Sequence, residues 1–144
     1  MTASGAELTG TTLHEGEASG RILRLEPLSF WGGTDLTGTI TDERHPHRGV
    51  SVTGRVLVMR SGRGSSSSSS VLAEQLRTGA GPAAIILAEV DPIIVTGAIV
   101  AAELYQRFLP IVQLTPEGFD LLGDDELVSV QATDRIARVR SLGC

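Results

Sequence analysis

Residues 52–76 read VTGRVLVMRSGRGSSSSSSVLAEQL, and the rest of the chain is organised around this stretch. The run from Val52 to Met59 becomes continuously apolar, which is typical of a strand buried on both faces. Leu72 and Leu76 follow with the four-residue spacing of a helix face. The glycines and serines between them therefore lie at a turn from a strand to a helix, and chemistry is often carried by such connections.

The composition of this turn suits the binding of an anion. Gly62 and Gly64 permit positive φ and a close approach of other groups to the backbone, and the start of the helix offers unpaired N–H groups. Ser65 would hold its hydroxyl in a field that favours the alkoxide, as a base or nucleophile requires. A flexible Gly/Ser linker is the alternative, although the helical pattern follows at once and no second module follows the run. No Lys-Ser/Thr pair closes the turn, so it is not a P-loop.

Length and charge indicate a single globular domain. The 144 residues suffice for one core, and the hydrophobic and charged fractions of 41% and 20% are ordinary for a soluble chain. The net charge of −5 argues against non-specific binding to nucleic acid, although all 12 basic residues are arginine. We therefore expect a cytoplasmic protein that does not bind nucleic acid.

Neither a membrane segment nor a thiolate metal site is predicted. The most apolar stretch, 92–105, is interrupted and too short to span a bilayer, and residues 1–20 lack the basic and apolar regions of a secretory signal. The one cysteine, Cys144, allows no internal disulfide. An iron–sulfur cluster or structural zinc could not be held by the thiolates of this chain alone.

The pattern of apolar residues predicts an α/β domain with a parallel βαβ core and flanking antiparallel strands. Residues 1–20 are polar and are expected to form a flexible tail before a folded domain at 21–144. The expected strands are 21–28, 50–59, 83–87, 109–114, 127–132 and 136–139, and the expected helices are about 66–78, 97–105 and a short one opened by 115–119. Residues 93–95 fit either a strand or the start of the second helix.

A glycine-bearing loop, 29–35, holds the only tryptophan of the chain. Trp31, Gly32 and Gly33 are candidates for an interface with a partner or substrate. A plug that covers one end of the core is the alternative, and the residues leave both open.

The segment 42–47, DERHPH, is polar and is bounded by Gly49. His45 and His47 have a spacing that could ligate a metal, but no third ligand cluster accompanies them, so no metal site is predicted. A solvated loop remains one interpretation. The other is a pair of Asp42 and His45 that orients a group in an active site.

Several motifs in a fixed order carry a resemblance to a known family. These are PLSFWGGTD at 27–35, ITD at 40–42 with His45-Pro46, GRGSS at 62–66, PAAII at 82–86 and GAIV at 97–100. Over about residues 22–139 the chain resembles the swivel domain of aconitase X. The resemblance implies a swivelling β/β/α fold and a hydro-lyase, and in many members this domain is a small subunit that pairs with a large catalytic subunit.

The resemblance also implies roles for the turn. Matched through Gly64, the serine that acts as base is Ser65, and Ser66 is the neighbour that supports it. Ordinary aconitases next have an arginine that grips a carboxylate, and this chain has Ser67 there, so recognition of a tricarboxylate is in doubt. Arg63, the one arginine of the turn, is a candidate for substrate binding.

The reaction implied by the resemblance is dehydration of a small β-hydroxy acid. It needs a base and a Lewis acid. The Lewis acid would be an iron–sulfur cluster held by the large subunit and not by this chain. The expected substrate is cis-3-hydroxy-L-proline, with mevalonate 5-phosphate as the alternative. A non-catalytic module that binds an anion or a partner is an alternative from a different functional class.

Overall fold

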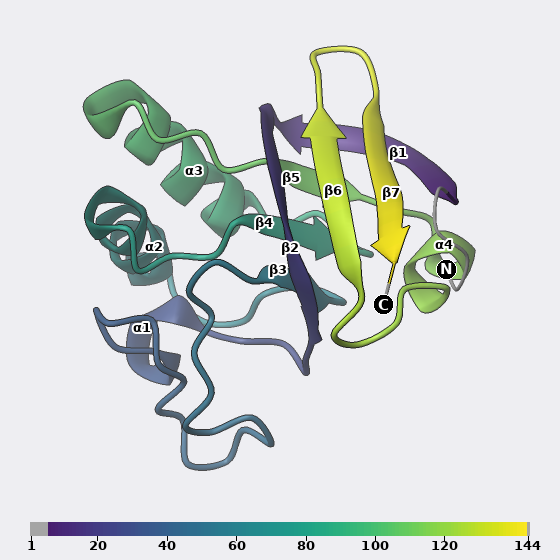
Figure 1. The fold of residues 1–144 in the computed structure, drawn as a ribbon. Helices are drawn as coiled ribbons and strands as arrows, with labels where there is room; N and C mark the ends of the chain where they lie inside the picture. Colours follow the sequence, from purple (N-terminus) through teal and green to yellow (C-terminus); the bar gives the residue numbers. More distant parts are fainter. Residues whose placement is uncertain (1–5, 144) are drawn as a thin grey trace.

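The computed structural model describes residues 6–143, which form a closed seven-stranded barrel with its two long helices on one side (Figure 1). The strand order is β1-β5-β4-β3-β2-β6-β7. The elements are β1 (Glu7–His14), β2 (Gly16–Arg24), α1 (Phe30–Gly33), β3 (Val56–Met59), α2 (Ser67–Thr78), β4 (Ala84–Leu87), α3 (Pro92–Tyr105), β5 (Ile111–Gln113), α4 (Pro116–Asp120), β6 (Leu127–Ala132) and β7 (Ala137–Gly143).

The barrel has a parallel half and an antiparallel half. Strands β2, β3, β4 and β5 are parallel neighbours, whereas β1, β7, β6 and the first part of β2 pair antiparallel. Helices α2 and α3 cover the outside of the parallel half, and β6 and β7 lie on the opposite side of the molecule (Figure 1). The expected parallel strand-helix-strand unit is confirmed by β3, α2 and β4.

The parallel strands are buried on both faces because each face meets a different hydrophobic cluster. One cluster lies between the strands and the two long helices, and it takes Leu57, Met59, Ile85 and Leu87. The other lies inside the barrel, and it takes Val56, Val58, Ala84 and Ile86. This two-sided burial explains why both strands read as continuous apolar runs.

The prediction of a flexible tail over residues 1–20 is wrong for residues 7–20, which lie in β1 and β2. Strand β1 pairs with β5 and β7, and residues 16–21 of β2 pair with β6. These strands have one wet face, so their Thr, Ser and Glu side chains alternate between exposed and half-buried positions. Their hydrogen-bond partners lie about a hundred residues away, and local composition carries no sign of them. Residues 1–5 lie outside the described part of the chain.

Side-chain caps set where helices α3 and α4 begin. Residues 93–95 belong to α3, because the carboxylate of Asp91 accepts hydrogen bonds from the N–H groups of Ile93 and Ile94 and starts the helix there. Thr115 caps α4 in the same way, through the N–H of Gly118.

The antiparallel pair of β6 and β7 is confirmed. No helix within residues 6–143 combines the length and apolarity needed to cross a membrane.

Candidate functional site

The glycine-serine turn lies at the carboxyl edge of the parallel strands. Strand β3 ends at Met59, and the turn at 62–66 leads from it into α2. The connection that follows β2 and the loop at 42–47 line the same region, because both contribute to one hollow beside the turn. Ligands of open parallel sheets bind at this edge, and the site is built from loops that a rigid sheet positions.

Both glycines of the turn are required, for different reasons. Gly64 has a φ of 112°, and a side chain there would also overlap the Oγ atom of Ser29. Gly62 lacks a positive φ but faces the carboxylate of Asp91, so a Cβ atom would overlap it. The N–H of Arg63 donates to the carbonyl of Leu28 at 3.1 Å. The turn is thus held against the chain after β2 on one side and against the start of α3 on the other.

The start of α2 presents unpaired backbone N–H groups. The N–H groups of Ser68 and Ser69 donate to the carbonyls of Ser65 and Ser66, so a tight first turn begins at Ser65 although α2 begins at Ser67. Among residues 6–143, no acceptor is found for the N–H groups of residues 64–67, and Ser66 makes no side-chain cap. We call residues 64–67 the amide array.

Ser65 itself is exposed at the amide array. Its Oγ atom makes no hydrogen bond with any part of the chain that the structure describes. A hydroxyl in this position is free to meet a ligand, and it belongs to the segment of unpaired N–H groups at the positive end of the α2 dipole.

A hollow of about 620 Å³ lies beside the turn. It is lined by Ser61, Gly62 and Arg63 from the turn, by Glu26 and Pro27 after β2, and by Asp42, Arg44, His45 and Pro46 from the loop. The structure therefore brings Arg63, Asp42 and His45 to one hollow, whereas Gly64, Ser65 and Ser66 are not among the residues that line it. Arg44 also lines this hollow. Nothing in the sequence distinguishes it, because an exposed arginine on a polar loop is ordinary.

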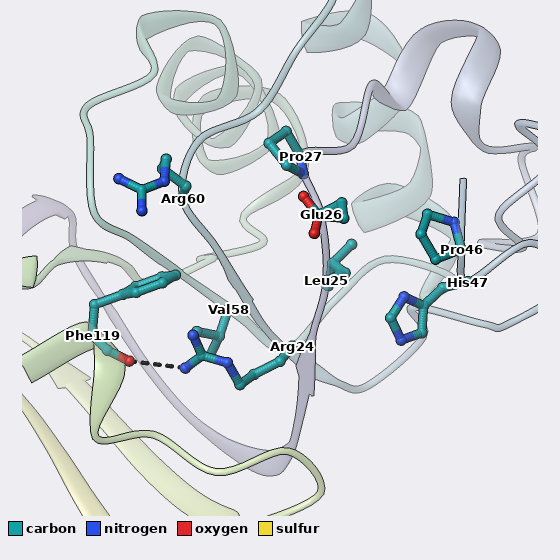
Figure 2. Close-up of a pocket in the computed structure, with 9 residues that line it drawn as sticks. All are labelled: Arg24, Leu25, Glu26, Pro27, Pro46, His47, Val58, Arg60 and Phe119. Carbon is teal, nitrogen blue, oxygen red and sulfur yellow. Dashed lines mark hydrogen bonds between the residues drawn. The ribbon is translucent and has the colours of Figure 1, made fainter. Parts of the chain in front are cut away.

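A second hollow of about 470 Å³ shares Glu26, Pro27 and Pro46 with the first (Figure 2). Arg24 lies over the ring of Phe119 at 4.8 Å from its centroid and donates to the carbonyl of the same residue at 2.9 Å. Arg60 also lines this hollow. Arg60 is not among the site residues expected from sequence, although its place directly after a buried parallel strand is a usable signal.

His45 and Asp42 do not pair through their side chains. The Nδ1 atom of His45 accepts from the N–H of His47 at 3.0 Å, so Nε2 carries the proton and donates to the carbonyl of Glu26 at 2.9 Å. The Oδ1 atom of Asp42 accepts from the N–H of Arg44 at 2.9 Å. The direct pair suggested by the sequence is wrong, because His45 is occupied by the backbone of His47 and Glu26, and Asp42 by the backbone of Arg44.

A metal site at the histidines finds no support in geometry. Within residues 6–143, no group of three or more His, Cys, Asp or Glu side chains is placed to hold a metal ion. Cys144 lies outside the described residues. The donors among the described residues therefore do not fit an iron–sulfur cluster.

The sequence of the loop at 29–35 suggested either a plug over the core or an interface, and neighbouring residues of the loop have these two different environments. Phe30 is 1% exposed and plugs the core, whereas Trp31 is 58% exposed. The helix α1 is interrupted at Trp31 and Gly32, and Gly32 has a φ of 83°. Gly33 is buried and its carbonyl accepts from the N–H groups of Thr41 and Asp42. The bend thus presents one large aromatic side chain beside the turn, which keeps the interface prediction for residues 31–33 open.

The fold and the serine turn together define a swivel domain. Residues 7–139 match the aconitase X swivel domain, and the chain belongs to this family. The solved holo-form of aconitase X from Thermococcus kodakaraensis superposes with a TM-score of 0.82 at 32% sequence identity, covering 96% of this chain and 99% of that one. The expected family and fold are thereby confirmed.

Two groups of named relatives are similar to the chain. It is 49% identical over 113 residues to the cis-3-hydroxy-L-proline dehydratase of Pseudomonas aeruginosa, covering 77% of this chain and 19% of that protein. It is 35% identical over 131 residues to the phosphomevalonate dehydratase small subunit of Methanosarcina acetivorans, covering 89% and 87% of the two chains. The chain therefore spans about a fifth of the first relative but nearly all of the second.

Proposed function

We propose that this chain is the small subunit of a two-chain dehydratase in the cytoplasm, with Ser65 as the base. The observation that carries the proposal is an exposed, unbonded serine hydroxyl within the segment that forms the amide array. Family membership and the names of the relatives support the reaction class, and the name of the small-subunit relative supports the two-chain form.

The proposed chemistry requires that the hydroxyl of Ser65 lose its proton. A serine hydroxyl is a very weak acid, so it acts as a base only after loss of its proton, and its alkoxide must be strongly stabilised. Preorganised N–H groups do this best when they point at the charge before it forms. The amide array provides such donors, and Ser66 and Gly64 contribute through their backbone and not through side-chain bonds to Ser65.

The substrate proposed first is cis-3-hydroxy-L-proline, because the more similar of the two relatives described above carries that name. Mevalonate 5-phosphate is the alternative, supported by the relative that this chain matches over most of its length. Arg63 and Arg44 border the hollow at the start of the turn and would attract the carboxylate that both substrates share. Asp42 and His45 would act by shaping the loop that carries Arg44.

The dehydration also needs a Lewis acid for the departing hydroxyl. The residues described here do not form a cluster site, so we propose that a large partner subunit holds the iron–sulfur cluster. The shared active site would then lie between the two chains, with Trp31, Gly32 and Gly33 in the contact. The exposure of Trp31 beside the turn supports this arrangement.

The test is co-expression of the chain with its candidate large subunit, followed by a dehydration assay with cis-3-hydroxy-L-proline. We expect activity only when both chains are present, and its loss in Ser65→Ala. Ser70→Ala is the matched control, because Ser70 is an exposed serine of the same run. If the complex forms but acts only on mevalonate 5-phosphate, the alternative substrate is correct.

A non-catalytic module that binds an anion or a partner remains the alternative from another class. It predicts that Ser65→Ala assembles with the large subunit and leaves the activity of the complex unchanged. That result would contradict the role of Ser65 as the base and favour the alternative.

A further inference from the structure

Ser68 differs from the other serines of the run. It is 4% exposed, and its neighbours Ser66, Ser67 and Ser70 are on the surface. Its Oγ atom accepts from the N–H of Trp31 at 3.1 Å and lies 3.3 Å from the Oγ atom of Ser29. The run of identical residues therefore hides one serine whose hydroxyl is committed to structure.

The direction of each hydrogen bond at Ser68 follows from the donors. Ser29 donates its own hydroxyl hydrogen to the carbonyl of Trp31 at 2.6 Å, so its Oγ atom is left to accept from Ser68. Trp31 N–H, Ser68, Ser29 and Trp31 C=O thus form a closed hydrogen-bond cycle, in which each bond polarises the next. We call it the Ser29–Ser68 cycle.

The Ser29–Ser68 cycle supports the turn directly. A Cβ atom built on Gly64 would overlap the Oγ atom of Ser29 and lie 3.4 Å from that of Ser68, so the backbone of Gly64 packs on the cycle. Ser65 is the next residue. The backbone directly before Ser65 is therefore in contact with the Ser29–Ser68 cycle.

A second tie makes the loop and the helix one unit. The side-chain amide of Gln75, which is fully buried, donates to Thr34 Oγ1 and to the carbonyl of Asp35, both at 2.9 Å. Gln75 lies seven residues after Ser68, two helical turns along the same face of α2. The segment 29–35 is thus attached to α2 at two points, and Ser68 is the point beside the amide array.

We propose that Ser68 is a positioning residue for Ser65, acting through Ser29 and the backbone of Gly64; this rests on the proposed function. The Ser29–Ser68 cycle sets the aim of the Ser65 hydroxyl and couples it to the bend that carries the exposed Trp31. Ser68 does not touch substrate. Its loss should lower kcat and leave KM nearly unchanged, because binding groups such as Arg63 keep their places.

The first measurement uses the isolated full chain and needs no activity. In Ser68→Ala the N–H of Trp31 loses its acceptor, and we expect its hydrogen exchange to become roughly tenfold faster, the effect of one lost hydrogen bond. The emission of Trp31, the only tryptophan, should shift in the same variant. Ser70→Ala should match the unmodified chain in both. Unchanged exchange in Ser68→Ala would overturn the cycle.

The second measurement uses the reconstituted complex. We expect kcat of Ser68→Ala to fall about tenfold or more, from misplacement of the reacting group, while Ser70→Ala keeps full activity. Ser68→Thr restores a hydroxyl and should recover most of kcat, which a purely structural loss would not do. If Ser68→Ala fails to fold, Ser29→Ala opens the same cycle from its half-buried side and gives the same comparison.

The outcomes separate the two proposals. An unmodified complex that dehydrates neither substrate would overturn the proposed function and the positioning role together. An active complex in which Ser68→Ala and Ser70→Ala have equal kcat would overturn the positioning role alone. An increase of KM without a fall of kcat would do the same, because it would assign Ser68 to substrate binding.

Discussion

Gly62 and Asp91 face each other across the carboxyl edge of the sheet, so closely that a side chain at position 62 would force Asp91 or Ile94 to shift. A Cβ atom there would overlap the Oδ2 atom of Asp91 and lie 2.7 Å from the Cδ1 atom of Ile94. The other carboxylate oxygen of Asp91 accepts from the N–H groups of Ile93 and Ile94. One carboxylate therefore starts α3 and also fixes where the serine turn lies.

Gly62→Ala should destabilise the fold by about 1–3 kcal/mol, the usual cost of overpacking a tight contact. Urea unfolding gives the change. Gly123→Ala is the matched control, since its new Cβ atom would lie 3.6 Å from Glu126 Oε1, an ordinary contact. Equal stabilities of the two variants would show that Gly62 has more room than the structure gives it.

Asp91→Ala should cost about 1 kcal/mol through loss of the cap of α3, and Asp91→Asn should recover most of this because it keeps an acceptor. The pair of variants also tests the contact with Gly62. Combined with Gly62→Ala, Asp91→Ala should cost less than the sum of the two single changes, since it removes part of the overlap. Strict additivity in urea unfolding would argue against direct contact.

His45→Ala should destabilise the domain by about 2–3 kcal/mol, because two backbone groups lose their partners and a buried ring leaves a gap. Asp42→Ala removes a single bond to the N–H of Arg44 and should cost about 1 kcal/mol. We expect both to lower the activity of the complex through the loop. An unchanged rate in the Asp42→Ala complex would show that Asp42 is not part of the site.

Asp35 should make stability depend on acid pH. The hydroxyl of Thr37, helped by the N–H of Thr39, holds the pKa of Asp35 below its ordinary value of 3.8. A lowered folded-state pKa means that this stabilisation is present above pH 3.8 and is lost as the pH falls through the folded-state pKa.

Asp35→Asn should therefore be less stable than the unmodified chain at pH 7, with the difference narrowing as the pH falls below 3.8. Urea midpoints across that range measure it. Thr37→Val removes the main cause of the pKa shift and should flatten the same dependence. A difference that is constant with pH in both variants would contradict the assignment.

The serine turn could be predicted from sequence because its signals are local. An apolar run, a glycine pair and a helical period of leucines meet within residues 52–76, and each reports on its own neighbourhood. The strands at 7–20 could not, since their polar faces resemble a tail and their partners are distant: Glu7 pairs with Arg140. Composition is a property of one segment, whereas strand pairing depends on two segments.

The same limit applies inside the site. Ser29 and Ser68 are 39 residues apart, and nothing in six consecutive serines marks the fourth one as buried. Helical spacing does contain a usable signal, because Ser68 lies on the face of α2 that also carries Leu72 and Gln75. The role of His45 was missed for a related reason: its ring is satisfied by backbone groups, which a list of side-chain types does not include.

The pairing of β1 with β7 has a consequence for how the protein is made. Residues 7–10 pair with residues 137–140, so one edge of β1 stays unpaired until β7 has left the ribosome. The parallel half and its helices can assemble before β7 is made, but closure of the barrel must wait for β7. Contacts of such sequence separation slow folding. Until closure, β1 is an open edge that a chaperone or another nascent chain can bind.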